Sequence, residues 1–536
     1  MRSATITPML RRIIATIESS SLTLYSFMGA VAGVVFLRFF LESFSARTPT
    51  GFVASDAPTL VHYGLFFLAA LLLHTLIVAF VTREKMLTVL KISTYALPLI
   101  LIAPIIDIFM GGGTMAYLIQ PLPELIADFL TFFGPLQGSG ATVGIRIELA
   151  IVLAGLGTYI WLKTASVWRT ALGVFLSYVV VFGMGAWPSL VAIATGGTAH
   201  VMFLASDLSS SLIARSFLHP SEVYSGFRLL EMYFSAYMAQ SMFLLSLICG
   251  YFVLRSISPR VVKAVKANMR PLRLLNYMAL ATLGFLLALY FAPITWSVYD
   301  VITVLVAFSC IKLLWVFAVT ANDLGDEDID RISNASRPLI TGAMSRTEMI
   351  QVAVGALILV ILGGLSLGSY SLFYLLIYVA IVVVYSFPPL RLRRFPVVSH
   401  MLIGFACLCM VLMGFFLASP ARELAAFPPY AALLVVIIFT LGLNLKDLKD
   451  EAGDRAAGVV TIATLLGAKR AQYVIAALLF VAALLVPFML QEPSLWIPCI
   501  VSGAIVAAGV AKGKREKFVF VIYFLFVLYL IFRLVA

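Results

Sequence analysis

Fifteen apolar segments, each long enough to cross a lipid bilayer, occupy most of this chain. Only 12% of the 536 residues are charged and 62% are hydrophobic, which leaves too little polar surface for a soluble protein of this length. The sequence therefore predicts an all-α polytopic membrane protein. The segments lie near residues 22–44, 59–82, 90–110, 146–162, 170–193 and 231–254, and then near 274–292, 298–320, 347–367, 371–386, 398–418, 428–445, 471–489, 493–511 and 518–535.

The distribution of basic residues supports this set of segments and predicts their direction. Cytoplasmic loops of membrane proteins carry an excess of lysine and arginine. With the N-terminus in the cytoplasm, most of the 37 lysines and arginines fall in predicted inner loops. We therefore expect an integral protein of the inner or plasma membrane, with the N-terminus inside and the C-terminus outside. The formal charge of +12 then reflects topology, and no nucleic-acid partner is expected.

A basic stretch at residues 255–273 divides the chain into a half with few acidic residues and a half with every acidic cluster. We expect an N-terminal membrane domain of about six spans at 1–255, a basic cytoplasmic linker at 256–273 and a second domain of about nine spans at 274–536. The role of the first domain and its protein partners cannot be inferred from its residues.

Only a few polar residues of the N-terminal half suggest specific contacts. Arg38 and Glu42 are one helical turn apart and are expected to pair, whereas Asp107 and Glu148 stand alone in the sequence. A short interfacial helix is expected at 123–133. Over the whole chain, the five cysteines all lie in apolar runs and are expected to be buried and free.

Two acidic motifs of identical spacing distinguish the C-terminal half. Each has aspartates at positions i, i+3 and i+7 after an apolar segment, and both fall on the predicted cytoplasmic side. If the preceding helix continues through the motif, its three carboxylates share one face. The motifs consist of Asp323, Asp326 and Asp330, and of Asp447, Asp450 and Asp454.

This pattern favours a metal site. Three carboxylates on one face repel each other unless a cation neutralises them. Oxygen ligands without histidine or cysteine favour Mg²⁺ over Ca²⁺ or Zn²⁺, and Mg²⁺ keeps positions open for phosphate oxygens. Two facing motifs could therefore clamp one diphosphate. The alternative is that both are solvated helix ends, although carboxylates at a helix C-terminus oppose the helix dipole.

Basic residues near the motifs are candidates for binding phosphate oxygens. Arginine forks suit such oxygens, although the excess of basic residues in inner loops could alone explain those at 391–394. Lys312 lies inside an apolar segment, three helical turns before Asp323, and therefore points to the same side. An intramembrane lysine usually faces an interior cavity, with a structural ion pair as the alternative. The substrate-binding candidates are Lys312, Arg337, Arg391, Arg393 and Lys446.

Three stretches resemble the UbiA superfamily of intramembrane prenyltransferases. NDLGDEDID with SRPLITG resembles its first aspartate motif, and YSFPPLRLRR resembles the loop between its motifs. KDLKDEAGDRAAG resembles its second motif, in the form typical of the chlorophyll-synthase, homogentisate and archaeal-lipid branches. The resemblance covers residues from about 270 to 536 and implies a nine-helix UbiA-like bundle around a cavity open to the bilayer.

The resemblance also implies an activity. A Mg²⁺-dependent prenyltransferase would move a polyprenyl group from its diphosphate to an aromatic or lipid acceptor in the membrane. The six motif aspartates would be the catalytic and Mg²⁺-binding residues, with Asn322 beside them. The resemblance also extends to Arg337, Arg391 and Arg393, although the family often has lysine at the position of Arg393.

Two other functions are alternatives. One branch of the superfamily transfers phosphoribose from its diphosphate to polyprenyl phosphate, but the form DLKDEAGD argues against it. A cation-coupled transporter could use the carboxylates as an ion path, but ion sites of transporters lie near the membrane midplane. The acidic motifs here lie at one membrane face.

Overall fold

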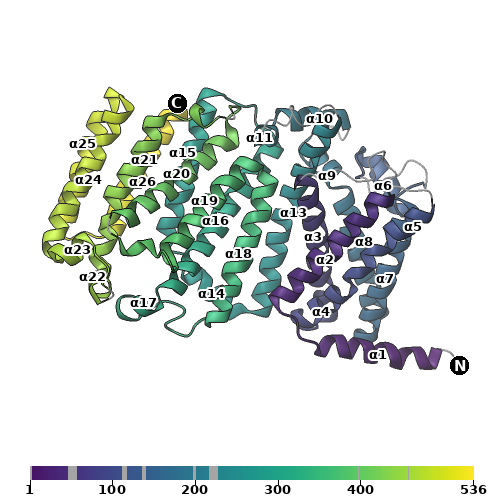
Figure 1. Ribbon diagram of the computed structural model, residues 1–536. Helices are drawn as coiled ribbons and strands as arrows, with labels where there is room; N and C mark the ends of the chain where they lie inside the picture. The colour runs from purple at the N-terminus through teal and green to yellow at the C-terminus, as the bar shows by residue number, and fades with distance from the viewer. Residues whose placement is uncertain are drawn as a thin grey trace. The chain divides into compact units, whose positions relative to one another are not determined.

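A computed structural model describes residues 3–45, 57–110, 117–135, 141–196, 201–216, 227–395, 397–421, 423–456 and 458–535. In these residues the chain forms helices and no strand (Figure 1). Fifteen helical runs in them are long and apolar enough to cross a membrane. The all-α membrane fold is thus confirmed, whereas the direction of each crossing stays a prediction.

The chain divides into two compact units, which are described separately. Unit 1 comprises Met1–Ser210, Tyr224–Pro259 and Ser297–Ile302, and unit 2 comprises Ser211–Val223, Arg260–Trp296 and Thr303–Ala536. This division differs from the boundary expected at 255–273 in two places. Helix α11 (Leu212–Ser216) belongs to unit 2, and the first residues of α16 (Val298–Gly325) belong to unit 1.

Unit 1 is built around α3 and α13, which pack extensively on each other. Leu65 of α3 and Phe243 of α13 are fully buried. The only cysteine of this unit, Cys249, is buried and free, as expected. The spanning-length runs of unit 1 are α2 (Leu24–Ser45), α3 (Ala57–Thr82), α4 with η1 and α5 (Met86–Met110), α7 (Val143–Thr164), α8 (Val167–Gly185) and α13 (Phe227–Ile257).

The third run of unit 1 is broken in the middle. The 3-10 turn η1 (Leu97–Leu101) separates α4 (Met86–Ala96) from α5 (Ile102–Met110), because Pro98 and Pro104 lack N–H groups. Arg38 donates to the Ile100 carbonyl, and the Ala103 N–H donates to Glu148 at 3.0 Å. These two buried charges therefore satisfy backbone groups near the break.

The same charges correct one expectation for the N-terminal half. Arg38 pairs with Glu42 at 3.1 Å, as its spacing predicts, but also with Glu148 at 2.8 Å. Glu148 is therefore not isolated, and neither is Asp107, which accepts from the Gly144 N–H at 2.8 Å. Sequence spacing could not show these contacts, because they join different helices.

Other helices of unit 1 also differ from expectation. The segment expected at 170–193 ends at Gly185, and α9 (Trp187–Ala194) starts anew with Pro188 in its first turn. A short helix, α6 (Leu122–Leu130), forms where one is expected at 123–133, and its interfacial position stays a prediction. Helix α1 (Ser3–Ser19) lies across the ends of the neighbouring helices (Figure 1), where Glu18 pairs with Lys163 at 2.7 Å.

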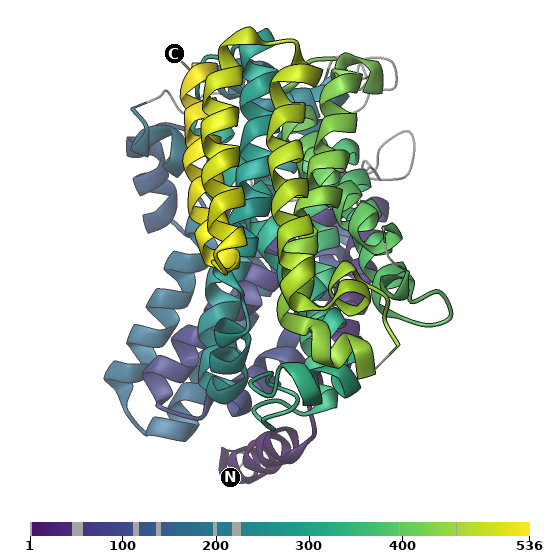
Figure 2. The ribbon, with the colours of Figure 1, turned by 90° about the vertical axis from the view of Figure 1, so that its left-hand side faces the viewer.

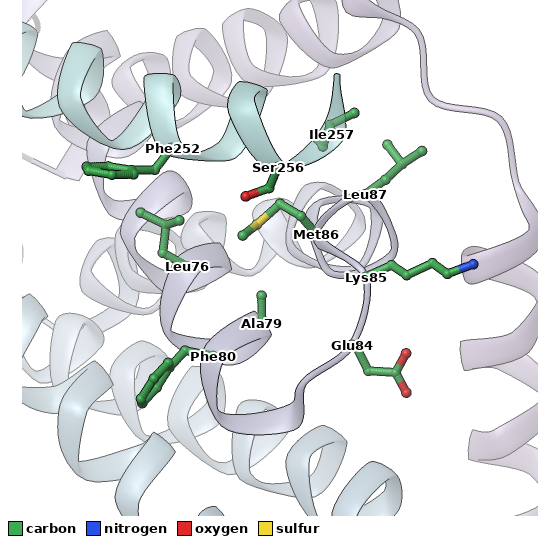
Figure 3. Close-up of a pocket in the computed structure, with 10 residues that line it drawn as sticks. All are labelled: Leu76, Ala79, Phe80, Glu84, Lys85, Met86, Leu87, Phe252, Ser256 and Ile257. Carbon is green, nitrogen blue, oxygen red and sulfur yellow. The ribbon is translucent and has the colours of Figure 1, made fainter. Parts of the chain in front are cut away.

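A pocket of about 750 Å³ lies within unit 1. Its lining comes from α3, from the start of α4 and from the end of α13 (Figure 3). Leu76, Met86 and Phe252 make most of it apolar, and Glu84 and Lys85 lie at one side. It contains none of the predicted site residues.

Unit 2 is held together by a close contact of α15 (Pro271–Phe291) with α20 (Val398–Ala418), the most buried long helix of this unit. A Cβ atom on Gly414 would lie 1.9 Å from the Ala281 carbonyl oxygen, and one on Gly284 would lie 1.9 Å from that of Val411. Glycines at both positions therefore let the two backbones touch, a common device between membrane helices. The four cysteines of this unit are buried and free, as expected.

Nine of the spanning-length runs among the described residues lie wholly or mainly in unit 2. The C-terminal helices α24, α25 and α26 run beside one another (Figure 2). These runs are α15 (Pro271–Phe291), α16 (Val298–Gly325), α18 (Arg346–Leu367), α19 (Ser369–Ser386), α20 (Val398–Ala418), α21 (Pro429–Gly442) with η4 and α22, α24 (Ala468–Leu490), η5 (Pro493–Leu495) with α25 (Trp496–Ala511), and α26 (Glu516–Val535).

Short helices close both ends of this bundle. The expected basic linker is largely helical, because α14 (Pro259–Ala267) buries Val261 and Ala264 beside Met344. Helices α14, α17 (Glu327–Ser333) and α22 (Asp447–Ala456) lie at one end of unit 2, and α11 lies at the opposite end (Figure 1). The segments that carry the two acidic motifs therefore lie at the same end of the bundle.

Candidate active site

The first acidic motif lies where α16 ends and α17 begins. Asp323 is in the last turn of α16, Asp326 is not helical, and Asp330 is in α17. All three are buried, with exposed fractions of 1%, 5% and 5%. The condition for a shared face, a helix that continues through the motif, is not met, because the helix is interrupted at Asp326.

This interruption lies beside a close approach of α19. A Cβ atom on residue 325 would lie 2.8 Å from the Ser386 carbonyl oxygen, so glycine suits this position. Arg391 then donates to the Gly325 carbonyl at 2.8 Å, which satisfies an acceptor at the end of α16. The apolar segment expected to end near residue 320 thus continues as helix into the motif.

The second acidic motif lies on one helix, as its spacing predicts. The chain leaves α21 through the 3-10 turn η4 (Leu443–Lys446) and enters α22 at Asp447. Asp447 and Asp454 are buried, with 5% and 4% exposed, and Asp450 is half-buried. The three carboxylates of the second motif therefore lie at the same end of the bundle as those of the first.

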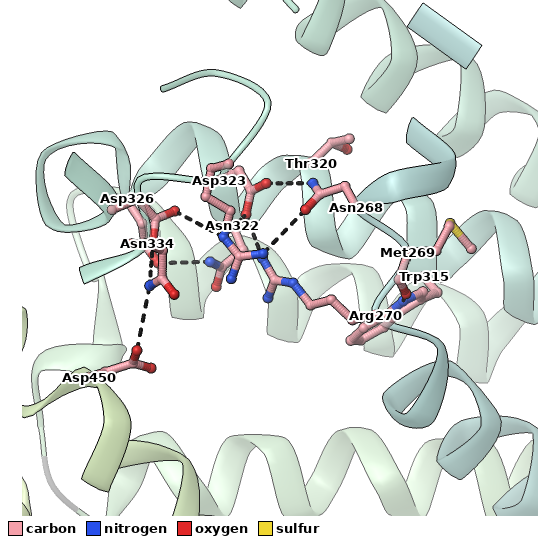
Figure 4. Close-up of polar contacts among 12 residues, drawn as sticks. Asn268, Met269, Arg270, Trp315, Thr320, Asn322, Asp323, Asp326, Asn334 and Asp450 are labelled. Atoms are coloured by element: carbon pink, nitrogen blue, oxygen red, sulfur yellow. Dashed lines mark hydrogen bonds and ion pairs between the residues drawn. The ribbon is translucent and has the colours of Figure 1, made fainter. Parts of the chain in front are cut away.

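Two side chains connect the motifs. The Asn334 amide donates to Asp330 at 2.9 Å. It also donates to Asp450 at 3.5 Å (Figure 4). Arg393 contacts Asp326 directly and lies 3.9 Å from Asp454. The structure therefore brings the two motifs into one site within unit 2.

Cationic groups surround the first motif. Arg270 pairs with Asp323 at 2.7 Å, and the Asn268 amide donates to the same carboxylate at 2.6 Å (Figure 4). The Arg337 Nε atom lies 3.8 Å from Asp323 and 3.7 Å from Asp330. Asn322, predicted beside the aspartates, donates to Asp326 at 2.8 Å.

Burial changes the acidity of several of these groups. It lowers the pKa of Arg270 to about 10, with nearby Arg337 acting in the same direction and Asp323 against it. It also lowers the pKa of Arg393, although the carboxylates of the second motif oppose the change. Burial raises the pKa of Asp330, against the effect of Arg337. Ion pairing across the site thus offsets part of the effect of burial on these pKa values.

The second motif has different neighbours. Lys446 donates to the Tyr385 hydroxyl at 3.0 Å instead of pairing with an aspartate. Lys449 lies 3.8 Å from Asp450. The His400 Nε2 atom lies 3.1 Å from the Asp447 carboxylate, and both residues are buried.

Sequence reasoning missed Asn268, Arg270, Asn334 and His400. Arg270 lies in the predicted basic linker, where basic residues are expected for topology alone. His400 lies at the start of an apolar segment that has no acidic residue near it in the sequence. A signal did exist for Arg270, since buried carboxylates require cationic partners and this linker is basic. No spacing rule pointed to the other three.

Lys312 is exposed, and no contact between it and the acidic motifs occurs in the described part of the chain. Its role in substrate binding stays a prediction. Asp328 is also exposed, and Glu327 pairs with Arg331 and Arg346 away from the site. These two acids therefore lie outside the cluster.

The site residues fit Mg²⁺ in donor type. Asp330 Oδ2 and Asp447 Oδ2 are buried acceptor atoms without a hydrogen-bond partner. Buried acceptors of this kind are costly unless a cation or donor reaches them. Among the described residues no three acidic, histidine or cysteine side chains converge on one point, because arginines lie between the carboxylates. Binding of Mg²⁺ would therefore require the carboxylates to exchange arginine partners for the ion.

The fold and this buried acidic site together define an integral membrane protein with a polar centre at one end of a helical bundle. A family model described as the UbiA prenyltransferase family matches residues 277–518. The digeranylgeranylglyceryl phosphate synthase of Methanothrix thermoacetophila is 30% identical over 195 residues, which are 35% of this chain and 67% of that enzyme. The chain therefore belongs to the UbiA prenyltransferase family, as its motifs predict.

Other relatives match shorter stretches. A chloroplastic 2-acylphloroglucinol 4-prenyltransferase of Humulus lupulus is 33% identical over 159 residues, which cover 28% of this chain and 38% of the relative. The chain thus spans under two-fifths of that enzyme. A solved UbiA homologue from Archaeoglobus fulgidus, bound to DMAPP and Mg²⁺, has 18% identity and a TM-score of 0.41, and the match covers 51% of this chain and 98% of that one.

Proposed function

We propose that this protein is a Mg²⁺-dependent intramembrane prenyltransferase. It would move a polyprenyl group from its diphosphate to an aromatic or lipid acceptor in the membrane. The observation that carries this proposal is the connection of two buried acidic motifs through Asn334 and Arg393 within one bundle. The names of the relatives, which are prenyltransferases of aromatic and glyceryl acceptors, support it.

The six motif aspartates would hold the metal, and the arginines would hold the diphosphate. Bound Mg²⁺ would neutralise negative charge that develops on the leaving diphosphate. Arg270, Arg337 and Arg393 now pair with the carboxylates. The same guanidinium groups would hold diphosphate oxygens, which arginine binds well, when metal is bound to the carboxylates.

The apolar bundle would protect the reaction from water. Ionisation of the allylic C–O bond yields a carbocation that water would otherwise capture. Helices α15, α16 and α19 supply aromatic side chains, and Trp315 of α16 donates to the carbonyl of Met269, the neighbour of Arg270. Tyr277, for example, is buried against Trp315 and Tyr378, with ring centroids 5.3 and 5.4 Å away. This wall would carry the isoprenoid tail.

The position of the acids favours an enzyme over a transporter. Both motifs lie at the end of the unit 2 bundle, and not in the middle of its long helices. With the N-terminus inside, as the basic residues predict, this end faces the cytoplasm. Water-soluble diphosphate could then leave directly into the cytoplasm.

A donor screen tests the proposal. The full-length protein, purified in detergent with Mg²⁺ and a membrane lipid extract, is given labelled allylic diphosphates of several lengths or labelled phosphoribosyl diphosphate. We expect label from an allylic diphosphate to enter a lipid or aromatic product, identified by mass spectrometry, together with release of diphosphate. Transfer of label from phosphoribosyl diphosphate alone would replace prenyl transfer with the phosphoribosyl alternative.

A further inference from the structure

His400 and Asp447 form an unusual buried pair at the second motif. His400 lies in the first turn of α20 and Asp447 in the first turn of α22, and only 3% and 5% of their surfaces are exposed. His400 Nε2 lies 3.1 Å from Asp447 Oδ2. Neither atom has a partner in hydrogen-bond geometry, and the two attract each other as an ion pair only when His400 is protonated.

Two cations that act on the Asp447 carboxylate from nearby, Lys446 and Arg393, also have other partners. The Lys446 ammonium is bonded to the Tyr385 hydroxyl, and Arg393 lies between Asp326 and Asp454. The other ring nitrogen of His400, Nδ1, lies 3.3 Å from the Ser399 hydroxyl. A proton on Nδ1 would leave Nε2 as an acceptor facing a carboxylate oxygen, which is favourable only with a cation between them.

The distance suits two ligands of one metal ion. Ligands on neighbouring corners of an octahedral ion, with bonds of about 2.1 Å, lie about 3 Å apart. Such ions commonly bind few protein groups and complete their shell with water and phosphate oxygens. A pair of protein ligands is therefore sufficient at this position.

We propose that His400 Nε2 is a nitrogen ligand beside Asp447 and that this half of the site binds a divalent transition metal such as Mn²⁺ more tightly than Mg²⁺. Imidazole nitrogen favours first-row transition metals, whereas Mg²⁺ favours oxygen. Ser399 orients the ring, as neighbours of metal-bound histidines usually do. The inference rests on the proposed function, since it assumes that the second motif binds metal.

Electron spin echo spectroscopy of bound Mn²⁺ tests this directly. Mn²⁺ is titrated into the full-length purified protein with inorganic diphosphate present, and the echo envelope is examined for coupling to imidazole nitrogen. We expect this coupling in the unaltered protein. His400→Gln removes it and weakens Mn²⁺ binding about 10- to 100-fold, while Mg²⁺ affinity, measured by competition, falls less.

A matched control is His74→Gln in unit 1, where the ring is bonded to the Ala70 carbonyl at 2.6 Å. It should retain both the coupling and the affinity. Mn²⁺ binding that depends on Asp447 but shows no nitrogen coupling, or coupling that survives in His400→Gln, overturns the histidine ligand alone. Mn²⁺ binding unaffected by both Asp323→Asn and Asp447→Asn overturns the proposed function as well.

Discussion

At the scale of single residues, the site is a balance of buried acids and arginines. Asp323 contacts Arg270 and Asn268, and Asp326 contacts Arg393. One oxygen of Asp330 accepts from Asn334. Such pairs are weak evidence for stability, because desolvation offsets much of their attraction. We expect these pairs to serve function, because the arginines that now contact the carboxylates could bind a diphosphate instead.

Arg393→Ala should weaken use of the prenyl diphosphate. Loss of charge-assisted hydrogen bonds costs about 1.5–3 kcal/mol, which corresponds to a decrease of about 10- to 150-fold in kcat/KM. Steady-state kinetics with the donor as the varied substrate measures this. Arg394→Ala is the matched control, because the neighbouring Arg394 is exposed, and it should stay within about twofold.

Arg393→Lys separates the two roles of this residue. It keeps the charge but loses the planar fork, so we expect partial recovery of kcat/KM. A purely structural role for Arg393 predicts instead a lower melting temperature with an unchanged KM, and that pattern would contradict diphosphate binding.

At the scale of helices, glycine contacts determine how closely α15 and α20 approach. Gly414→Ala places a methyl group against the Ala281 backbone, which cannot move aside as a flexible side chain could. We expect destabilisation of about 1–3 kcal/mol, seen as a lower melting temperature of the detergent-solubilised protein.

Gly442→Ala serves as the control for this contact. The new methyl group would meet only the end of Leu479, at 3.6 Å, and alanine is the better helix former. The substitution should leave stability unchanged or raise it by about 0.5–1 kcal/mol. Equal losses in both variants would show that close backbone approach is not what Gly414 provides.

The helices also show what sequence could and could not predict. Hydrophobic length located the long helices, and the spacing of Asp447, Asp450 and Asp454 predicted one helix, because these are local properties. The interruption after Gly325 was missed, since the approach of Ser386 beside it comes from another helix. His400 and Asn268 were missed for the same reason, because their partners lie far away in sequence.

At the scale of the whole molecule, the N-terminal half contributes helix α11 to unit 2. Arg215 of α11 donates to the carbonyls of Ala292 and Ala418, at 2.9 and 3.0 Å. Gly368 makes room for the Ser216 carbonyl, since a Cβ there would lie 2.2 Å away. A fragment of residues 256–536 contains both acidic motifs but lacks α11.

Co-expression of fragments tests whether α11 stabilises the rest of unit 2. We expect residues 256–536 alone to be less stable than when co-expressed with residues 1–255, because buried carbonyls lose their donor. Co-expression with residues 1–210, which lack α11, should not restore stability. Arg215→Ala in the 1–255 fragment should reduce the recovery, as measured by yield and melting temperature. Equal stability of 256–536 with and without 1–255 would contradict this role.

The most direct test of the central claim is product formation by the full-length protein with an allylic diphosphate, with and without Mg²⁺. We predict turnover that stops when a chelator removes divalent metal and returns when Mg²⁺ is added. Asp323→Ala and Asp447→Ala should lower turnover at least about 100-fold while the protein remains folded. Asp328→Ala, at an exposed aspartate beside the site, should keep it. Metal-independent turnover, or full activity in either of the first two variants, would contradict the proposed function.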